Sequence, residues 1–349
     1  MNSEVIKFVA GGGKTTYSQN YLKEHKNGLY LAFNNSVVDD LKKKGYLCRT
    51  IDSLFASYII PKLIALIPLA SINSDIMYID PSKFKSNLRA ISKINIDKNG
   101  NLYNQSKRIV NVTLYTKNRD LYKMKYFANI QFLKIIFGEN KLCLTDSLRV
   151  GISSFLLENY SDKILELLQK RFDYIIIDEA QDLKGYREKF AQVLYNSDIK
   201  LILLGDDNQN INGGGQWFES LPVTESKNES FRCSENVCEW IRNNLQIDIH
   251  GTDTIASVNI INKEQVLDYN DGTRCLLYKA NIPSIKSIIN EWSGPTFTIQ
   301  GVKGGTLDND IVILGQTLND KYYYTALTRT RKSVYTTISI KKYIKIAKR

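Results

Sequence analysis

A short apolar run, residues 5–9 (VIKFV), leads into three glycines, Gly11, Gly12 and Gly13, which are followed by Lys14 and Thr15. The apolar run predicts a buried strand, and the glycines predict a tight turn before a helix. Such a turn directs backbone N–H groups at an anion, and the dipole of the helix adds to the attraction. The segment therefore predicts a phosphate-binding loop in an α/β fold. Because position 8 is phenylalanine where the full motif has glycine, a flexible turn is the alternative.

A second segment, residues 174–182 (YIIIDEAQD), is an apolar run that ends in two carboxylates. This pattern predicts a buried parallel strand that delivers acids to the carboxyl edge of a sheet, where ligands bind in such folds. With a nucleoside triphosphate at the loop, Lys14 would reach the terminal phosphates, and Thr15 and Asp178 would hold Mg²⁺. Glu179 would orient or deprotonate the attacking water. The alternative is that the acids form the N-cap and first turn of a helix.

Composition limits the class of protein. A chain of 349 residues predicts two or three domains, and no apolar run is long enough to span a membrane. The five cysteines are odd in number and include no Cys-x-x-Cys pair, so we expect neither a disulfide framework nor a zinc site. A reducing, cytoplasmic setting fits these cysteines.

Most of the net charge of +11 lies in one segment. Residues 81–150 contain 14 Lys and Arg against 4 Asp and Glu, with aromatic residues interleaved. Cations for phosphates and flat rings for bases are typical of a nucleic-acid surface. The candidate contacts are Lys117, Arg119, Lys123 and Lys125. The alternative is a solvated basic face whose aromatic residues form a local core.

Strands alternate with helices on both sides of this segment, which predicts parallel α/β sheets. We expect strands at 28–33 and 200–204, a helix over 153–170, and a hinge at the glycines 213–215. A second α/β set has predicted strands at 274–278, 296–299, 310–314 and 334–340. The predicted division is a first domain of residues 1–60 and 150–226, a basic insertion of residues 61–149, and a second domain of residues 227–349.

At this level of detail the chain resembles a superfamily 1 DNA helicase of the UvrD/Rep type. Residues 10–15 (AGGGKT) match the family's AGSGKT loop, and residues 178–182 are identical to its DEAQD box. Six further segments resemble family motifs in the same order along the chain. They are residues 32–35 (AFNN), 50–55 (TIDSLF), 205–211 (GDDNQNI), 230–233 (SFRC), 298–304 (TIQGVKG) and 325–331 (TALTRTR).

The resemblance implies two RecA-like domains, with the basic segment inserted in the first, and ATP and Mg²⁺ bound between them. It implies that Gly11, Gly12, Gly13, Lys14, Thr15 and Thr16 bind the nucleotide. It further implies that Gln209 senses the γ-phosphate, and that Arg232 and Arg329 act as arginine fingers from the second domain. Phe33, Asn34, Ser53 and Thr298 correspond to residues that contact single-stranded DNA.

Several positions depart from the family pattern. Asp52 replaces a histidine, and Thr306 replaces a glutamate that contacts the ribose. The family's base-stacking tryptophan corresponds to Gly214, so Trp217 either substitutes for it or belongs to the core. Only 65 residues separate Arg232 from Phe297, where UvrD-type proteins carry a large extra domain. This chain therefore resembles a minimal translocase core.

We expect an ATP-dependent helicase or translocase that moves on single-stranded DNA, with RNA not excluded. Two alternatives stay open. One is a nucleic-acid-stimulated NTPase that remodels its substrate without unwinding it, and the other is a non-enzymatic subunit that only binds nucleic acid. A protein partner in a replication, repair or defence assembly is a further expectation, and a membrane partner is not expected.

Overall fold

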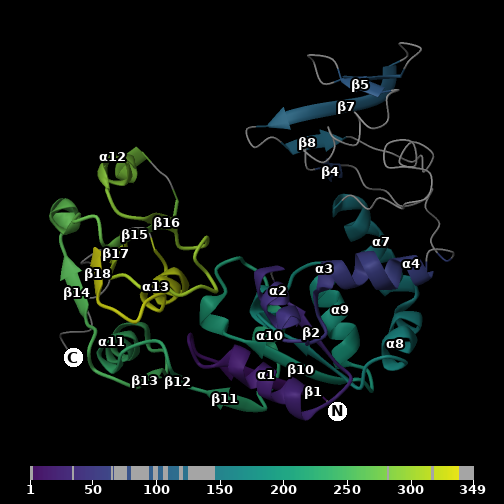
Figure 1. The fold of residues 1–349 in the computed structure, drawn as a ribbon, viewed down its shortest axis with the longest axis horizontal. Helices are drawn as coiled ribbons and strands as arrows, with labels where there is room; N and C mark the ends of the chain where they lie inside the picture. The colour runs from purple at the N-terminus through teal and green to yellow at the C-terminus, as the bar shows by residue number, and fades with distance from the viewer. Residues whose placement is uncertain are drawn as a thin grey trace.

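The computed structural model describes residues 3–33, 35–63, 66, 146–280, 283–315 and 318–337, and the backbone of five strands between residues 77 and 124. Two parallel sheets organise the chain (Figure 1). The first has six strands in the order β11-β1-β10-β9-β2-β3. Their bounds are β1 Ser3–Phe8, β2 Gly28–Ala32, β3 Cys48–Thr50, β9 Tyr174–Ile177, β10 Lys200–Gly205 and β11 Glu225–Lys227.

Helices cover both faces of the first sheet, because alternate residues of each strand point to opposite sides. Val5, Leu29 and Ile175 pack on one side, and their neighbours Ile6 and Tyr30 pack on the other. The helices α1 Lys14–Glu24 and α2 Asn35–Lys43 cover the side of Ile6. The opposite side is covered by α3 Ile51–Leu54, η1 Phe55–Ile59, α4 Ile60–Leu63, α7 Asp146–Asn159, α8 Ser161–Gln169, α9 Tyr186–Tyr195 and α10 Gln216–Ser220.

The second sheet has five parallel strands in the order β14-β18-β17-β15-β16. They are β14 Val258–Ile261, β15 Cys275–Tyr278, β16 Thr296–Thr298, β17 Ile311–Ile313 and β18 Val334–Thr337. One face packs on α11 Glu235–Leu245 and α13 Asp320–Leu327, and the other on η5 Lys263–Tyr269 and α12 Pro283–Glu291. A short parallel pair, β12 Glu229–Ser230 and β13 His250–Gly251, follows the first sheet. The two RecA-like parallel-sheet domains predicted from the sequence are confirmed.

The segment between α4 and α7 contains strands of a different kind. β4 Met77–Ile79, β5 Ile94–Ile96, β6 Asn101–Asn104, β7 Ile109–Lys117 and β8 Leu121–Met124 form an antiparallel sheet in the order β4-β8-β7-β6-β5. Arg119 and Lys125 lie outside the described residues, as do the side chains of Lys117 and Lys123. Within the described part of the chain, no helix combines the length and apolar character that crossing a membrane requires.

Two local predictions were wrong. The expected helix over 153–170 is two helices, α7 and α8, which are separated at Tyr160. The glycines 213–215 do not lie between the two domains as the expected hinge, because Gly214 and Gly215 pack against the backbone of residues 181–183 in the first domain. The Gly215 N–H donates to the Leu183 carbonyl at 2.9 Å, and a Cβ at Gly215 would lie 2.2 Å from the Gln181 carbonyl oxygen. The chain then returns to the first sheet as β11 before it enters β12.

Candidate active site

The glycine-rich loop connects β1 to α1 at the carboxyl edge of the first sheet. Gly11 and Gly13 have φ angles of 73° and 85°, in the left-handed region that glycine adopts without strain. A Cβ on Gly11 would lie 2.5 Å from Cβ of Arg232, so only glycine fits against the second domain there. Gly13 is the N-cap of α1 and has no side chain to cap the helix, which leaves the first N–H groups of α1 available to an anion.

Lys14 points from this loop to the two acids that follow β9. Its Nζ lies 3.4 Å from Oε1 of Glu179. Burial on its own lowers the pKa of Lys14, but the carboxylates of Glu179, Asp178 and Asp206 outweigh it and raise the pKa. Burial and the charge of Glu179 raise the pKa of Asp178, whose Oδ2 also accepts a hydrogen bond from the Tyr30 hydroxyl. The structure thus brings Lys14 together with the two acids that follow β9, Asp178 and Glu179.

Glu179 itself has an unusual backbone. Its φ and ψ of 53° and 43° are left-handed, a conformation that costs energy in a residue other than glycine. Gln181 donates a hydrogen bond to its Oε2. Burial favours the neutral form of Glu179, but Lys14 and Lys303 dominate and hold its pKa below the usual range. The carboxylate is therefore charged and held in position, as a group that orients water has to be.

The second domain delivers two arginines to the same place. Arg329 is 1% exposed, and its Nη2 donates to Oε1 of Gln209 at 2.7 Å. Burial and the neighbouring Arg232 lower the pKa of Arg329 to about 10, so it stays charged at neutral pH. Arg232 donates from Nη1 to the Thr328 carbonyl at 3.1 Å. Gln209 ends a 3₁₀ turn, η4 Asp207–Gln209, directly after β10.

A buried ion pair also joins the two domains. Nζ of Lys303 lies 2.6 Å from both carboxylate oxygens of Asp182, the last residue of the DEAQD segment, which ends the 3₁₀ turn η3 Ala180–Asp182. Beside it, Gln300 donates to Asn212 at 2.8 Å. The sequence placed each of these residues in a motif or next to one, but it gave no indication that they meet.

A cavity of about 800 Å³ lies among these groups. Its lining includes Gly11, Gly12, Gly13, Lys14, Thr15, Thr16, Phe33, Asp178, Glu179, Gln209, Phe231, Arg232, Thr306, Arg329 and Arg331. The donor set suits a nucleoside triphosphate with Mg²⁺, because N–H groups and cations face phosphates, while a hydroxyl and a carboxylate are the oxygen ligands that Mg²⁺ prefers.

Comparison with protein families agrees with this geometry. Residues 15–213 match the model of the UvrD/REP helicase N-terminal domain, and residues 141–337 match that of the viral superfamily 1 RNA helicase core domain. Each match covers more than half of the chain. The chain belongs to helicase superfamily 1.

Solved structures similar to this superfamily 1 helicase include the PRRSV helicase and an arterivirus helicase. The PRRSV helicase is 12% identical with a TM-score of 0.47, over 96% of this chain and 52% of that one. Arterivirus nonstructural protein 10 (helicase) in complex with DNA is 12% identical with a TM-score of 0.48, over 99% and 63%. The chain thus covers less than two thirds of the length of these helicases. No curated protein matches it.

The residues predicted to contact nucleic acid lie at strand ends of both domains. Phe33 follows β2 and is 42% exposed, and Ser53 lies in α3, directly after β3. Thr298 ends β16, where its Oγ1 accepts a hydrogen bond from the Gly301 N–H at 3.1 Å. Asn34 lies outside the described residues. Because these strands are parallel to their neighbours, Phe33 and Ser53 share the carboxyl edge of the first sheet with the nucleotide loop, and Thr298 lies at the carboxyl edge of the second sheet.

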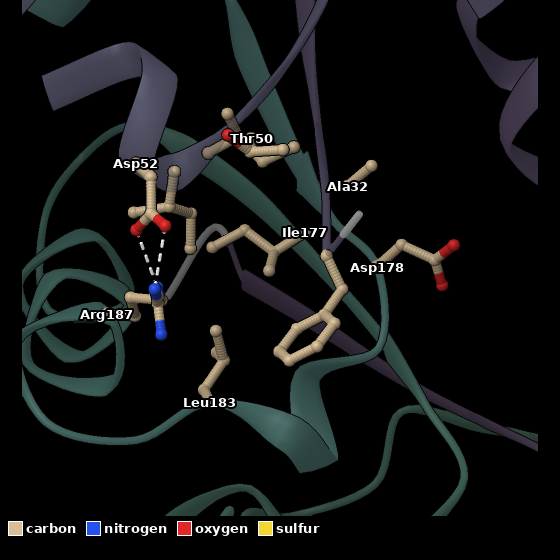
Figure 2. A pocket seen from close by; sticks show the side chains of 10 residues that line it. Ala32, Thr50, Asp52, Ile177, Asp178, Leu183 and Arg187 are labelled. Atoms are coloured by element: carbon tan, nitrogen blue, oxygen red, sulfur yellow. Dashed lines mark hydrogen bonds and ion pairs between the residues drawn. The ribbon is translucent and has the colours of Figure 1, made fainter. Parts of the chain in front are cut away.

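Asp52, which stands where the family has histidine, is bound to its own domain. Both of its carboxylate oxygens accept hydrogen bonds from Arg187, each at 2.7 Å (Figure 2). Nη2 of Arg149 lies 3.2 Å from Oδ2 of Asp52. Tyr186 donates a further hydrogen bond. These partners hold the pKa of Asp52 below its usual value, although burial opposes them. Asp52 therefore ties α3 to α7 and α9.

Trp217 belongs to the core. It is partly buried against the first sheet's helical layer, and its ring meets Tyr195 edge to face at 5.8 Å. Of its two interpretations from sequence, this packing favours the core. Among the cavity residues that the sequence did not single out as site residues are Phe231, which is 54% exposed beside Gly13, and Arg331. The sequence signal that could have identified them is their position next to Arg232 and Arg329 within the same motif segments.

Proposed function

We propose that this chain is an ATP-dependent helicase or translocase that moves on single-stranded DNA and hydrolyses ATP in the cleft between its two domains. Residues 1–60 and 150–226 form the first domain, 61–149 the basic insertion and 227–349 the second domain. The observation that carries the proposal is the contact between Arg329 and Gln209, because it brings the second domain into the cavity of Lys14 and Glu179. The four cysteines in the described part of the chain are buried and free of disulfides, which fits a cytoplasmic setting.

Each residue has a distinct part in the proposed hydrolysis. The N–H groups of the glycine loop and Lys14 hold the terminal phosphates, and Thr15 and Asp178 hold Mg²⁺, which neutralises phosphate charge when bound. Glu179 orients the attacking water and accepts its proton. Gln209 senses the γ-phosphate, and Arg232 and Arg329 stabilise charge that develops during transfer. Since the arginines and Gln209 lie on different domains, hydrolysis is coupled to closing and opening of the cleft.

The proposed path of the DNA strand crosses the carboxyl edges of both sheets, past Phe33, Asn34, Ser53 and Thr298. An exposed ring at Phe33 offers a stacking surface for a base. When one domain moves relative to the other, the distance along the strand changes between the contacts of the first domain, at Phe33, Asn34 and Ser53, and the contact of the second domain, at Thr298.

A steady-state ATPase assay with single-stranded DNA, single-stranded RNA or no nucleic acid tests the proposal. We expect DNA to stimulate turnover in the unaltered chain. In Lys14→Ala, nucleotide affinity falls roughly 10- to 100-fold because a charge-assisted contact is lost. Lys23→Ala, an exposed position on the same helix, is the matched control. If no condition gives turnover, the remaining interpretation is a non-enzymatic subunit that binds nucleic acid. If ATP is hydrolysed but a duplex substrate shows no strand displacement, the remaining interpretation is an NTPase that remodels without unwinding.

The basic insertion is expected to supply much of the affinity for nucleic acid. The logarithm of the binding constant for a single strand falls with that of the salt concentration, with a slope of about −0.7 per neutralised phosphate. Reversing Lys117, Arg119, Lys123 and Lys125 to glutamate therefore weakens binding and flattens this slope. Fluorescence anisotropy of a labelled strand measures both, with Lys26→Glu and Lys286→Glu as controls at exposed positions elsewhere. An unchanged slope would assign the insertion to another partner.

A further inference from the structure

The backbone groups of one residue in the nucleotide loop, Ala10, are hydrogen-bonded by side chains of the second domain. Ala10 is fully buried between β1 and the glycines. Its N–H donates to the Tyr324 hydroxyl at 2.8 Å, and its carbonyl accepts from the Ser230 hydroxyl at 2.7 Å. Tyr324 lies in α13, and Ser230 ends β12. Because a buried peptide without partners is costly, the loop geometry shown here depends on the position of the second domain.

Tyr324 extends this contact to the groups that face the phosphates. Its hydroxyl donates to Oδ2 of Asp206 at 3.1 Å, and the same oxygen accepts from Nε2 of Gln209 at 2.7 Å. Gln209 in turn accepts from Arg329 at 2.7 Å. A continuous series of hydrogen bonds thus runs from Ala10 through Tyr324, Asp206 and Gln209 to Arg329. Every side chain in it is buried.

The hydroxyl is suited to this place because one oxygen can accept and donate at once. Burial and the charge of Asp206 raise the pKa of Tyr324 well above its usual value, so the group keeps its proton. Phenylalanine would fill the same space and remove both bonds. The adjacent Tyr323 is equally buried, but its hydroxyl donates to the Thr337 carbonyl within the second domain.

We propose that Tyr324 is a positioning residue that couples the nucleotide loop to Gln209 and Arg329, so that the γ-phosphate sensor and the arginine finger are aligned only when the domains are closed on the loop. This inference rests on the proposed hydrolysis of ATP. It assigns the coupling to a single hydroxyl that contacts neither phosphate nor metal.

The first test uses the nucleotide-free chain and needs no activity. Hydrogen exchange measured by mass spectrometry on the peptide that contains Ala10 compares Tyr324→Phe with Tyr323→Phe. We expect exchange of the Ala10 amide to be about tenfold faster in Tyr324→Phe, because its acceptor is gone, and unchanged in Tyr323→Phe. Equal protection in the two variants would overturn the contact and with it the inference.

The second test measures kcat and KM for ATP. With the loop uncoupled from Gln209, kcat of Tyr324→Phe is expected to fall about tenfold while KM stays within about twofold, and Tyr323→Phe retains normal values. In a Gln209→Ala background the tyrosine substitution should have no further effect, because the series is already broken. The coupling would be refuted if Tyr324→Phe raised KM without lowering kcat. It would also be refuted if the effects of Tyr324→Phe and Gln209→Ala on kcat were fully additive. An unaltered chain without turnover would refute the proposed function, and the exchange test would still decide the loop contact.

Discussion

Glu179→Gln will slow ATP turnover by roughly 10²- to 10⁴-fold, the usual contribution of a general base, and leave nucleotide binding intact. The amide keeps the size of the side chain but does not accept a proton from water. Binding persists because Lys14 and the glycine loop hold the phosphates, and loss of the carboxylate beside Lys14 removes a competitor for that lysine. Phosphate release measures turnover, and a fluorescent nucleotide analogue measures affinity.

The matched control for this substitution is Glu158→Gln, on an exposed position of α7 in the same domain. It makes the same chemical change far from the cavity lining and should leave turnover and binding unaltered. If Glu179→Gln keeps most of its turnover, the water is activated by another group and the role assigned to Glu179 is wrong.

The second large effect is expected at the arginines. Arg232→Ala and Arg329→Ala should each lower kcat by on the order of a thousandfold, as for other arginine fingers, with a smaller loss of nucleotide affinity. Arg329 also donates to the carbonyls of Thr325 and Gly305, so its removal deletes these hydrogen bonds together with the one to Gln209. Arg329→Lys is therefore measured alongside, because it keeps the charge but not the planar set of donors.

Thermal unfolding separates the catalytic effect from damage to the fold. We expect Arg329→Lys to unfold near the temperature of the unaltered chain and still lose most of its turnover. Near-normal turnover in both Arg232→Ala and Arg329→Lys would mean that these arginines are structural.

The sequence predicted the parts of the fold and site that depend on local pattern. Apolar runs such as 174–177 and 200–204 are strands because the sheets are buried on both faces, and Lys14 meets Glu179 because loop and acids follow strands of the same sheet. The alternation of strand and helix was enough to predict two parallel sheets. Local pattern did not predict the break at Tyr160, where one helix was expected.

Contacts between distant segments were not predictable in this way. The ion pair of Lys303 with Asp182 joins residues 121 positions apart, and no periodicity links them. The glycines 213–215 suggested a hinge because glycine is conformationally permissive, but the absence of side chains at Gly214 and Gly215 allows close approach to the backbone at 181–183. Trp217 is similar, since its residue type does not distinguish a stacking platform from a core ring.

The peptide at Ala10 bears on how this protein can be divided and how it can evolve. Residues 10 and 324 are 314 positions apart, yet one hydrogen bond joins them inside the molecule. A fragment that ends before β12 would carry the complete glycine motif and lack both partners of that peptide. Expressed alone, it should be a poor nucleotide binder despite an intact signature. For the same reason, we expect that neither domain can be replaced independently by that of a relative. A substitution at residue 230 or 324 changes the constraint on residue 10, because these side chains pair its backbone groups.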